Sequence, residues 1–227
     1  MKKFTSLFSA GIILSTMVGG GLTAFADADV VADDTKTTPV HAAFTLPENG
    51  GENPSVPEDP DNNDNTNNES TKAFAIAYQP KKFEFGTTEL QESGEQTIAS
   101  KNTKPYRVGV KDKRRENKGW TLTAQLDWSG DNKDQMAGTS IKVSGAEVKK
   151  NVNGETEGAV NPDGVSGQTD FSIGSTAVNV MTASAKQRND VYDDKLSNVS
   201  LVIPEAKNVA AGDYNGTVTW SLTSAPK

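Results

Sequence analysis

Apolar and polar residues alternate one by one through much of the chain after residue 72. The clearest run is Trp120-Thr121-Leu122-Thr123-Ala124-Gln125-Leu126, and shorter runs cover residues 74–78, 106–110, 199–203 and 218–222. A period of two places the apolar side chains on one face of a strand, as in an antiparallel sheet with one buried face. Several strands at this spacing predict an all-β fold, an antiparallel Ig-like β-sandwich in a single domain.

Turn-forming dipeptides separate the alternating runs. Asn153-Gly154 and Asn215-Gly216 are pairs that two-residue hairpin turns favour, because the central residues of such turns adopt positive φ. Helical periodicity is weak throughout, and residues 181–197 are the best helix candidate. An upstream run at residues 40–46 predicts a first strand of the same domain, the alternative being that residues 27–71 are entirely a tail.

The first 26 residues have the organisation of a secretory signal peptide. Lys2 and Lys3 precede an apolar stretch, and Ala24-Phe25-Ala26 supplies small residues at a cleavage site. Serine, threonine and glycine interrupt the stretch, which disfavours the alternative of a membrane anchor. We therefore expect secretion, with residues 1–26 removed, residues 27–38 as an N-terminal tail, residues 39–227 as the domain, and no membrane span in the mature chain.

Residues 47–71 differ in composition from the rest of the chain. They contain four Pro, seven Asn, seven acidic residues and no basic residue, and Val56 is their only large aliphatic residue. So little apolar surface predicts a disordered acidic loop, inserted near the start of the domain. Acidic and amide residues from Asp59 to Asn65 alternate as in a calcium loop, but the central Gly and closing Glu are absent, so we expect no metal site.

Composition excludes several classes of function. The chain has no Cys and a single His, His41, which rules out disulfides, thiolate metal sites and His-pair zinc motifs. Loss of Lys2 and Lys3 with the signal peptide would change the net charge from −7 to −9, which disfavours nucleic-acid binding. We expect a non-enzyme without cofactors, although the sequence leaves open a glycoside hydrolase that uses two carboxylates.

Two Trp-x-Leu tripeptides are the most specific motifs. Trp120-Thr121-Leu122 is the first, and the second lies in Tyr214-x-Gly-x-x-x-Trp220-x-Leu222 near the C-terminus. Together with the signal peptide, the Pro/Asp/Asn-rich segment and Phe85-Gly86, they resemble the WxL-domain cell-surface proteins of low-GC Gram-positive bacteria.

The resemblance covers essentially the whole mature chain. It implies a protein of the cell surface that is attached non-covalently to the peptidoglycan of the cell wall. It also implies a multi-protein surface complex with other WxL proteins and WxL-interacting surface proteins. The alternative functions are an adhesin for host or matrix factors and a wall-directed hydrolase.

The motif residues permit two roles. Trp and Leu two positions apart on a strand share one face, and a buried Trp removes on the order of 200 Å² from water. If that face is exposed instead, the same side chains can bind wall sugars or a protein partner. The candidates for wall or partner binding, or for the core, are Trp120, Leu122, Trp220, Leu222 and Tyr214.

One dense basic segment precedes the first motif. It is expected to form a hairpin tip between the strands at residues 106–110 and 120–128. Its cations could contact teichoic-acid phosphates or wall carboxylates, the alternative being a solvated tip. The candidates for polyanion contact are Lys111, Lys113, Arg114, Arg115 and Lys118.

Overall fold

The computed structural model describes residues 36–47, 50–69 and 72–225. The expected signal peptide, residues 1–26, and most of the expected tail lie outside the described residues. Residues 44–227 form one compact unit, and residues 36–43 of the other unit have neither strand nor helix. Among the described residues, the longest helical segment is the four-residue 3-10 turn Lys133–Met136, and no helix is long and apolar enough to span a membrane.

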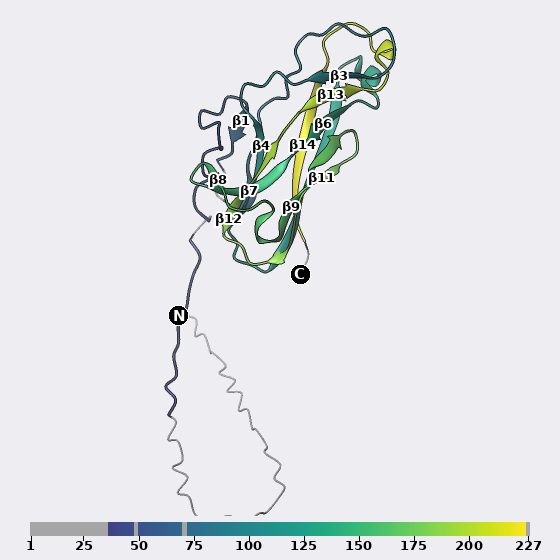
Figure 1. Ribbon diagram of the computed structural model, residues 1–227. Coiled ribbons are helices and arrows are strands. Elements are labelled where there is room, and N and C mark those ends of the chain that lie inside the picture. The colour runs from purple at the N-terminus through teal and green to yellow at the C-terminus, as the bar shows by residue number, and fades with distance from the viewer. Residues whose placement is uncertain (1–35, 48–49, 70–71, 226–227) are drawn as a thin grey trace, which may run out of the picture. The chain divides into compact units, whose positions relative to one another are not determined.

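The described chain is all-β with antiparallel pairing, which confirms the predicted fold class (Figure 1). It has three sheets. The first has the order β1 (Asn65–Asn67), β2 (Phe74–Pro80), β4 (Tyr106–Asp112), β12 (Asp190–Leu196), β7 (Glu147–Val152) and β8 (Glu155–Glu157). The second has the order β10 (Asp170–Ile173), β6 (Ser140–Ser144), β13 (Ser200–Ile203) and β3 (Gln96–Ala99). The third has the order β14 (Asn215–Ser224), β5 (Lys118–Ser129), β11 (Val178–Lys186) and β9 (Val165–Gly167).

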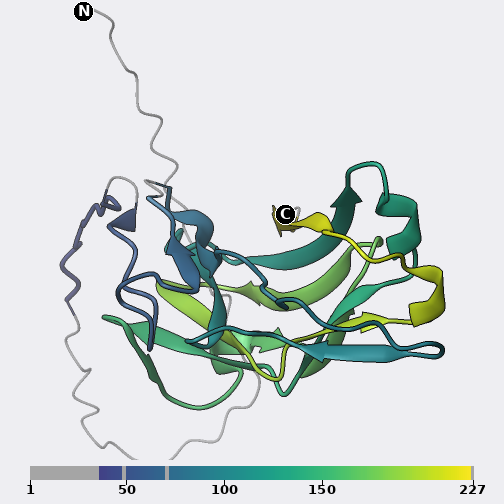
Figure 2. The same cartoon turned by 90° about the horizontal axis from the view of Figure 1, so that it is seen from above.

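The first two sheets are consecutive parts of one layer. The chain runs from β3 into β4, from β6 into β7 and from β12 into β13, and the neighbours keep the same order in both sheets. The third sheet packs its apolar face against this layer, and Figure 2 shows the arrangement from above. The result is a β-sandwich.

The core consists of the inward residues of both layers. Trp120, Leu122, Ala124 and Leu126 of β5 are all buried, while the residues between them are partly exposed. They form one cluster with buried residues of the opposite layer, including Tyr192 of β12. The period-two pattern therefore identified the buried face of β5 correctly.

Glycine has a structural role at two positions, one in a turn and one where a ring lies against the backbone. The predicted Asn153-Gly154 turn joins β7 to β8, and both residues have positive φ, 54° and 95°. On β4, Gly109 lies beneath the ring of Tyr78, where an added Cβ would stand 2.3 Å from Cζ. Tyr78 can cover β4 only because that side chain is missing.

Four local predictions differ from the structure. Residues 181–197 form β11 and β12 instead of a helix, and Asn215-Gly216 is the start of β14 instead of a turn. The alternating residues 40–46 form no strand, and Val40 and Phe44 are 90% and 93% exposed. The basic segment is not a hairpin tip, because β4 and β5 belong to different layers and the segment links those layers. Alternation specifies a strand face, but it does not specify the pairing partner.

The acidic segment also differs from the expectation of a disordered loop over residues 47–71. Val56 is buried with Ala77, Tyr78 and Val191. The buried carboxylate of Asp59 accepts hydrogen bonds from the backbone N–H groups of residues 63, 64 and 65 at 2.8, 3.0 and 2.9 Å. Hydrogen bonds of acidic and amide side chains thus hold residues 50–69, which a count of apolar surface does not register.

Candidate functional site

The two Trp-x-Leu tripeptides lie side by side on paired strands. β5 and β14 are antiparallel, and Leu122 stands directly opposite Leu222. In the same ladder, Trp120 faces Ser224 and Trp220 faces Ala124. Segments that are far apart in the sequence therefore share one inward face of the third sheet.

The two motifs differ in burial. Trp120 is 1% exposed, and its ring lies 6.2 Å from that of Tyr192 between centroids. Leu122 is also fully buried, so these two side chains offer no surface to a ligand in this structure. Trp220 and Leu222 are half-buried and pack against the core from the edge of the sheet.

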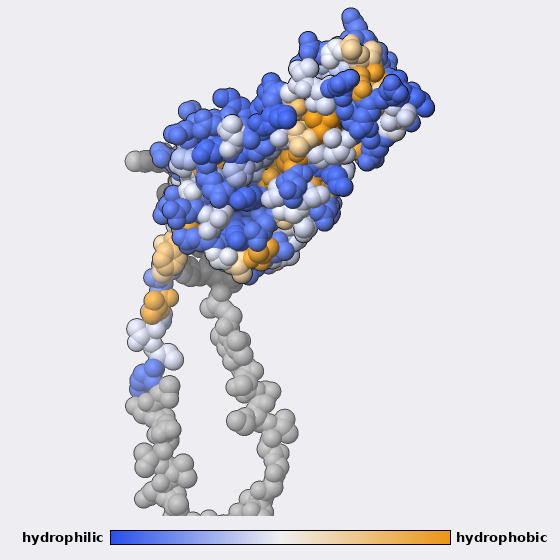
Figure 3. All heavy atoms as spheres, turned by 45° about the horizontal axis from the view of Figure 1, so that its top comes forward, coloured by the Kyte–Doolittle hydropathy of each residue, from blue (hydrophilic) through white to orange (hydrophobic). Residues whose placement is uncertain are grey.

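A groove of about 510 Å³ runs between β2 and β14. Its apolar lining residues are Phe74, Ala75, Ile76 and Leu222, and its polar lining residues are Asn68, Glu69 and Lys72. Figure 3 shows apolar side chains gathered in a stripe on an otherwise polar face of the domain. Leu222 is thus the motif residue that lines an open groove.

Tyr214 lies outside the residues that line this groove. Its hydroxyl is 2.7 Å from Oε1 of Gln135 and 3.0 Å from the carbonyl oxygen of Ala210. Its half-buried ring packs against a second apolar cluster that contains Met136 and Val209. These contacts give Tyr214 a place in the packing before β14.

The basic segment does not form one continuous patch. Lys111 is buried and donates to the carbonyl oxygen of Gly51 at 2.9 Å, and burial, followed by the charge of Lys113, lowers its pKa. Arg114 donates to both carboxylate oxygens of Asp112, at 2.8 and 3.0 Å, and its guanidinium lies 3.7 Å above the ring of Phe74. Both cations are therefore occupied by contacts within the domain.

The other three basic residues differ in exposure. Lys118 lies 2.6 Å from a carboxylate oxygen of Glu116, and Lys113 is half-buried. Arg115 is exposed, with a positive φ of 53°. Arg115 is thus the candidate that the structure leaves most accessible to a polyanion.

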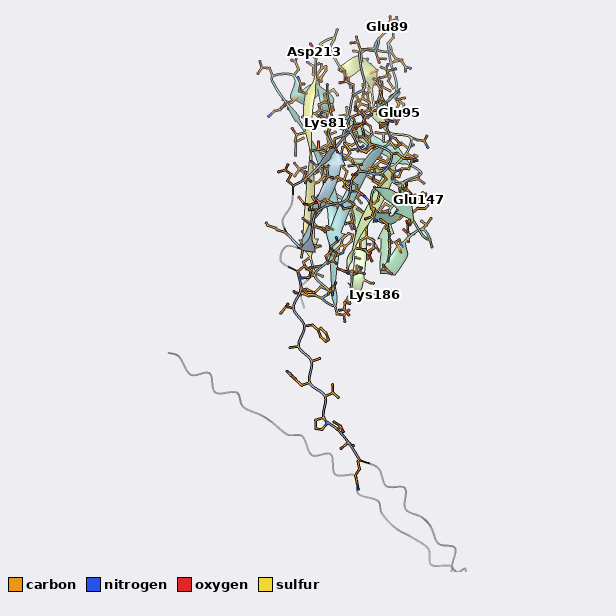
Figure 4. The ribbon with its side chains drawn as sticks, turned by 90° about the vertical axis from the view of Figure 1, so that its left-hand side faces the viewer. Lys81, Glu89, Glu95, Glu147, Lys186 and Asp213 are labelled. Atoms are coloured by element: carbon orange, nitrogen blue, oxygen red, sulfur yellow. The ribbon has the colours of Figure 1, made fainter. Side chains whose placement is uncertain are left out.

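A second hollow, of about 380 Å³, lies on the outer face of the second sheet. Pairing places Ser172, Lys142 and Ser200 in one row across β10, β6 and β13. Figure 4 labels Glu95 at this hollow, between Glu89 at one end of the domain and Glu147 nearer the middle. The remaining lining residues are Thr97, Ser140, Ser144, Asn198 and Val202.

Sequence reasoning did not single out this hydroxyl-rich surface. Its residues alternate with buried Ile141, Val143 and Leu201, so the period-two pattern marks them as an outward face. The pattern does not reveal that the outward faces of four strands, β10, β6, β13 and β3, lie next to one another. That adjacency depends on strand pairing, which is a property of the folded chain.

The most perturbed carboxylates lie inside the domain. Burial raises the pKa of Asp193 to about 6, although Arg107 pairs with it and Tyr78 donates to it at 2.9 Å. Burial, followed by the charge of Asp193, raises the pKa of Asp194 well above its ordinary value. Among the described residues there is no cluster of three or more acidic or His side chains that could hold a metal.

Comparison with known proteins identifies the family. The family model for the WxL domain, described as surface cell wall-binding, matches residues 23–226. Comparisons with curated proteins and with solved structures gave no match. Because the family match covers nearly the whole chain, the protein belongs to the WxL domain family of surface cell wall-binding proteins.

Proposed function

We propose that this domain binds peptidoglycan non-covalently and without catalysis, within a multi-protein surface complex. The proposal places the wall contact at the polar hollow on β3, β13, β6 and β10. The observation that carries it is the row of Ser172, Lys142 and Ser200, which presents two hydroxyls and an ammonium group on one concave sheet face.

The chemistry of the hollow suits a hydrated wall polymer. Glycan hydroxyl and acetamido groups and stem-peptide amides exchange hydrogen bonds with Ser, Thr and Asn side chains. Lys142 can pair with a stem-peptide carboxylate, and Glu95 with an amino group. A repeating polymer adds many such weak contacts, so moderate affinity at each position is sufficient for retention.

The absence of catalysis is supported by the placement of the perturbed acids. A glycoside hydrolase needs two accessible carboxylates on either side of the scissile bond. Asp193 and Asp194 are both buried, and they project from adjacent positions of one strand toward opposite faces of the sheet. Neither carboxylate is available to a glycan.

Wall binding is tested with purified peptidoglycan and the chain from residue 27 onward. We expect Lys142→Glu combined with Ser172→Tyr to reduce retention at least tenfold, because the change reverses one charge and fills the hollow. Lys133→Glu changes the charge equally at an exposed residue outside the hollow and is the matched control. Equal retention of both variants would refute the assignment of the hollow.

The same assay tests attachment and chemistry. We expect a chaotrope to release the wild-type protein from the wall and wall turbidity to stay constant. Release only by a muramidase would contradict non-covalent attachment, and a falling turbidity would contradict the absence of catalysis.

A parallel assay with Arg115→Ala, on walls with and without teichoic acid, tests the polyanion contact. If Arg115 contacts teichoic acid, the variant should bind more weakly only to walls that contain it.

A further inference from the structure

We propose that the domain assembles with itself by strand addition. Residues Val40–Leu46 of one copy would pair with the open edge of β14 in a second copy. This inference concerns a protein–protein surface and does not depend on the wall-binding hollow, which lies on another sheet.

The acceptor is the outer edge of β14. This strand has ten residues and lies at the end of its sheet, with β5 as its only paired neighbour. The N–H of Ala225 donates to the carbonyl oxygen of Gly119 at 3.0 Å, so the odd-numbered residues face β5. By alternation, the backbone groups of Val218, Trp220 and Leu222 point toward the open edge.

This edge lacks the usual protection against strand pairing. Its sequence, Asn215–Ser224, contains neither a charged residue nor a Pro. The other sheet-edge strands in the described part of the chain have only three or four residues each: β1, β3, β8, β9 and β10. β14 is therefore the edge with enough length and suitable composition to accept another strand.

The side chains at this edge are also incompletely covered. Val218, Trp220 and Leu222 are each half-buried and point toward the core. Of these three, Leu222 lines the groove of about 510 Å³, together with Phe74 and Ile76 of β2. A strand added at β14 would place every second side chain over this groove.

The donor is the alternating segment near the start of the described chain. Val40, Ala42, Phe44 and Leu46 would share one face of a strand, and the three larger side chains are 90%, 93% and 48% exposed. The segment forms no strand in this structure. Its period of two, its length and its apolar face are those of a strand that could pair with the open edge of β14.

The proposed partner is a second copy of the same chain, because every chain carries both the donor segment and the acceptor edge. In the described structure β14 pairs only with β5, so donor and acceptor are both available. An added strand forms a regular series of backbone hydrogen bonds with the N–H and C=O groups of the β14 edge, and a glycan in the same groove cannot form that series. Because the contact is heterologous, each dimer would retain one donor and one acceptor, and chains of copies could grow.

Analytical ultracentrifugation of the chain from residue 27 onward tests the proposal. We expect the mass to increase with concentration to at least twice that of the monomer. Phe44→Asp should abolish the association, whereas Thr45→Asp adds the same charge to the opposite face and should preserve it. Leu222→Lys should also abolish it and Thr223→Lys should not, with circular dichroism to verify that each variant is folded.

A mixing experiment identifies the occupant of the edge. The Phe44→Asp chain keeps its acceptor, and the Leu222→Lys chain keeps its donor. Each should be monomeric alone, and their mixture should form a dimer and nothing larger. Three results would each overturn the proposal: a wild-type chain that stays monomeric, equal effects of Phe44→Asp and Thr45→Asp, and a mixture that stays monomeric. A monomeric wild-type chain is also the result expected if the segment pairs with β14 of its own chain.

Discussion

Two adjacent carboxylates on β12 have opposite environments. Asp193 lies on the outer face of its sheet, where Arg107, Tyr78 and Glu58 form a polar cluster around it. Asp194 is fully buried and has no ion pair or side-chain hydrogen bond among the described residues, and the backbone of Glu147 offsets the effect of burial on its pKa only in part. A buried carboxylate without a directly paired cation favours the protonated form, because the desolvation cost of ionisation is larger than what its neighbours offset.

Asp194 should make the stability of the domain decrease as pH rises. The folded chain keeps the proton on Asp194 above the ordinary pKa of 3.8, at which the unfolded chain releases it. The free energy of unfolding is therefore highest below that value and falls as pH rises toward the folded pKa. We expect Asp194→Asn to weaken this decrease and to stabilise the domain at pH 8 by about 1–3 kcal/mol.

Urea denaturation between pH 4 and pH 8 measures this effect. Asp127→Asn, at an exposed position of β5, is the matched control and should retain the wild-type pH dependence. An unchanged pH dependence in Asp194→Asn would contradict the role of this carboxylate.

At the scale of elements, the two Trp-x-Leu strands have unequal positions. β5 lies between β14 and β11, so its inward side chains are enclosed by neighbours on both sides. β14 has a neighbour on one side only, and none of its ten residues is fully buried. The same tripeptide therefore serves the core on one strand and an open edge on the other.

This difference predicts unequal costs for the same substitution. Trp120→Ala should destabilise the domain by about 3–5 kcal/mol, because it empties a volume enclosed by the core. Trp220→Ala should cost roughly half of that or less, because its side chain is already partly in water. Urea denaturation of both variants provides the comparison, and equal losses would show that Trp220 is as enclosed as Trp120.

On the scale of the whole molecule, the first sheet is covered on its outer face by the acidic segment. Lys111 donates to Gly51, Asn151 donates to the carbonyl oxygen of Ser55, and Arg107 pairs with Glu58. These polar contacts give hydrogen-bond or ion-pair partners to Lys111 and Arg107 of β4 and to Asn151 of β7, all of which are buried.

Removal of the central carboxylate should release this cover. Asp59→Ala leaves the N–H groups of residues 63–65 without their acceptor, and we expect a loss of about 1–3 kcal/mol. Hydrogen exchange should accelerate over residues 50–69 while β5 stays protected. Asp61→Ala, at an exposed position in the same segment, should leave exchange unchanged, and equal acceleration in both variants would refute the anchoring role of Asp59.

The sequence alone determined the fold class and the family. Alternation at residues 120–126 predicted both the strand and its buried face, and the two Trp-x-Leu motifs indicated the family that the comparison later matched. These properties are local, because a strand face depends on neighbouring residues and a motif on a short spacing.

Only the tertiary structure decided which strands pair and what each side chain faces. It buried Trp120 in the core and left Trp220 half-buried on an edge strand. It also placed β4 and β5 in different layers, gave the cations of the basic segment different surroundings, and held the acidic segment against the first sheet by hydrogen bonds. It also left Val40 and Phe44 without a strand partner, although their alternation matches that of β2. The physical reason is that pairing and burial depend on contacts between residues far apart in the chain, which a period of two does not encode.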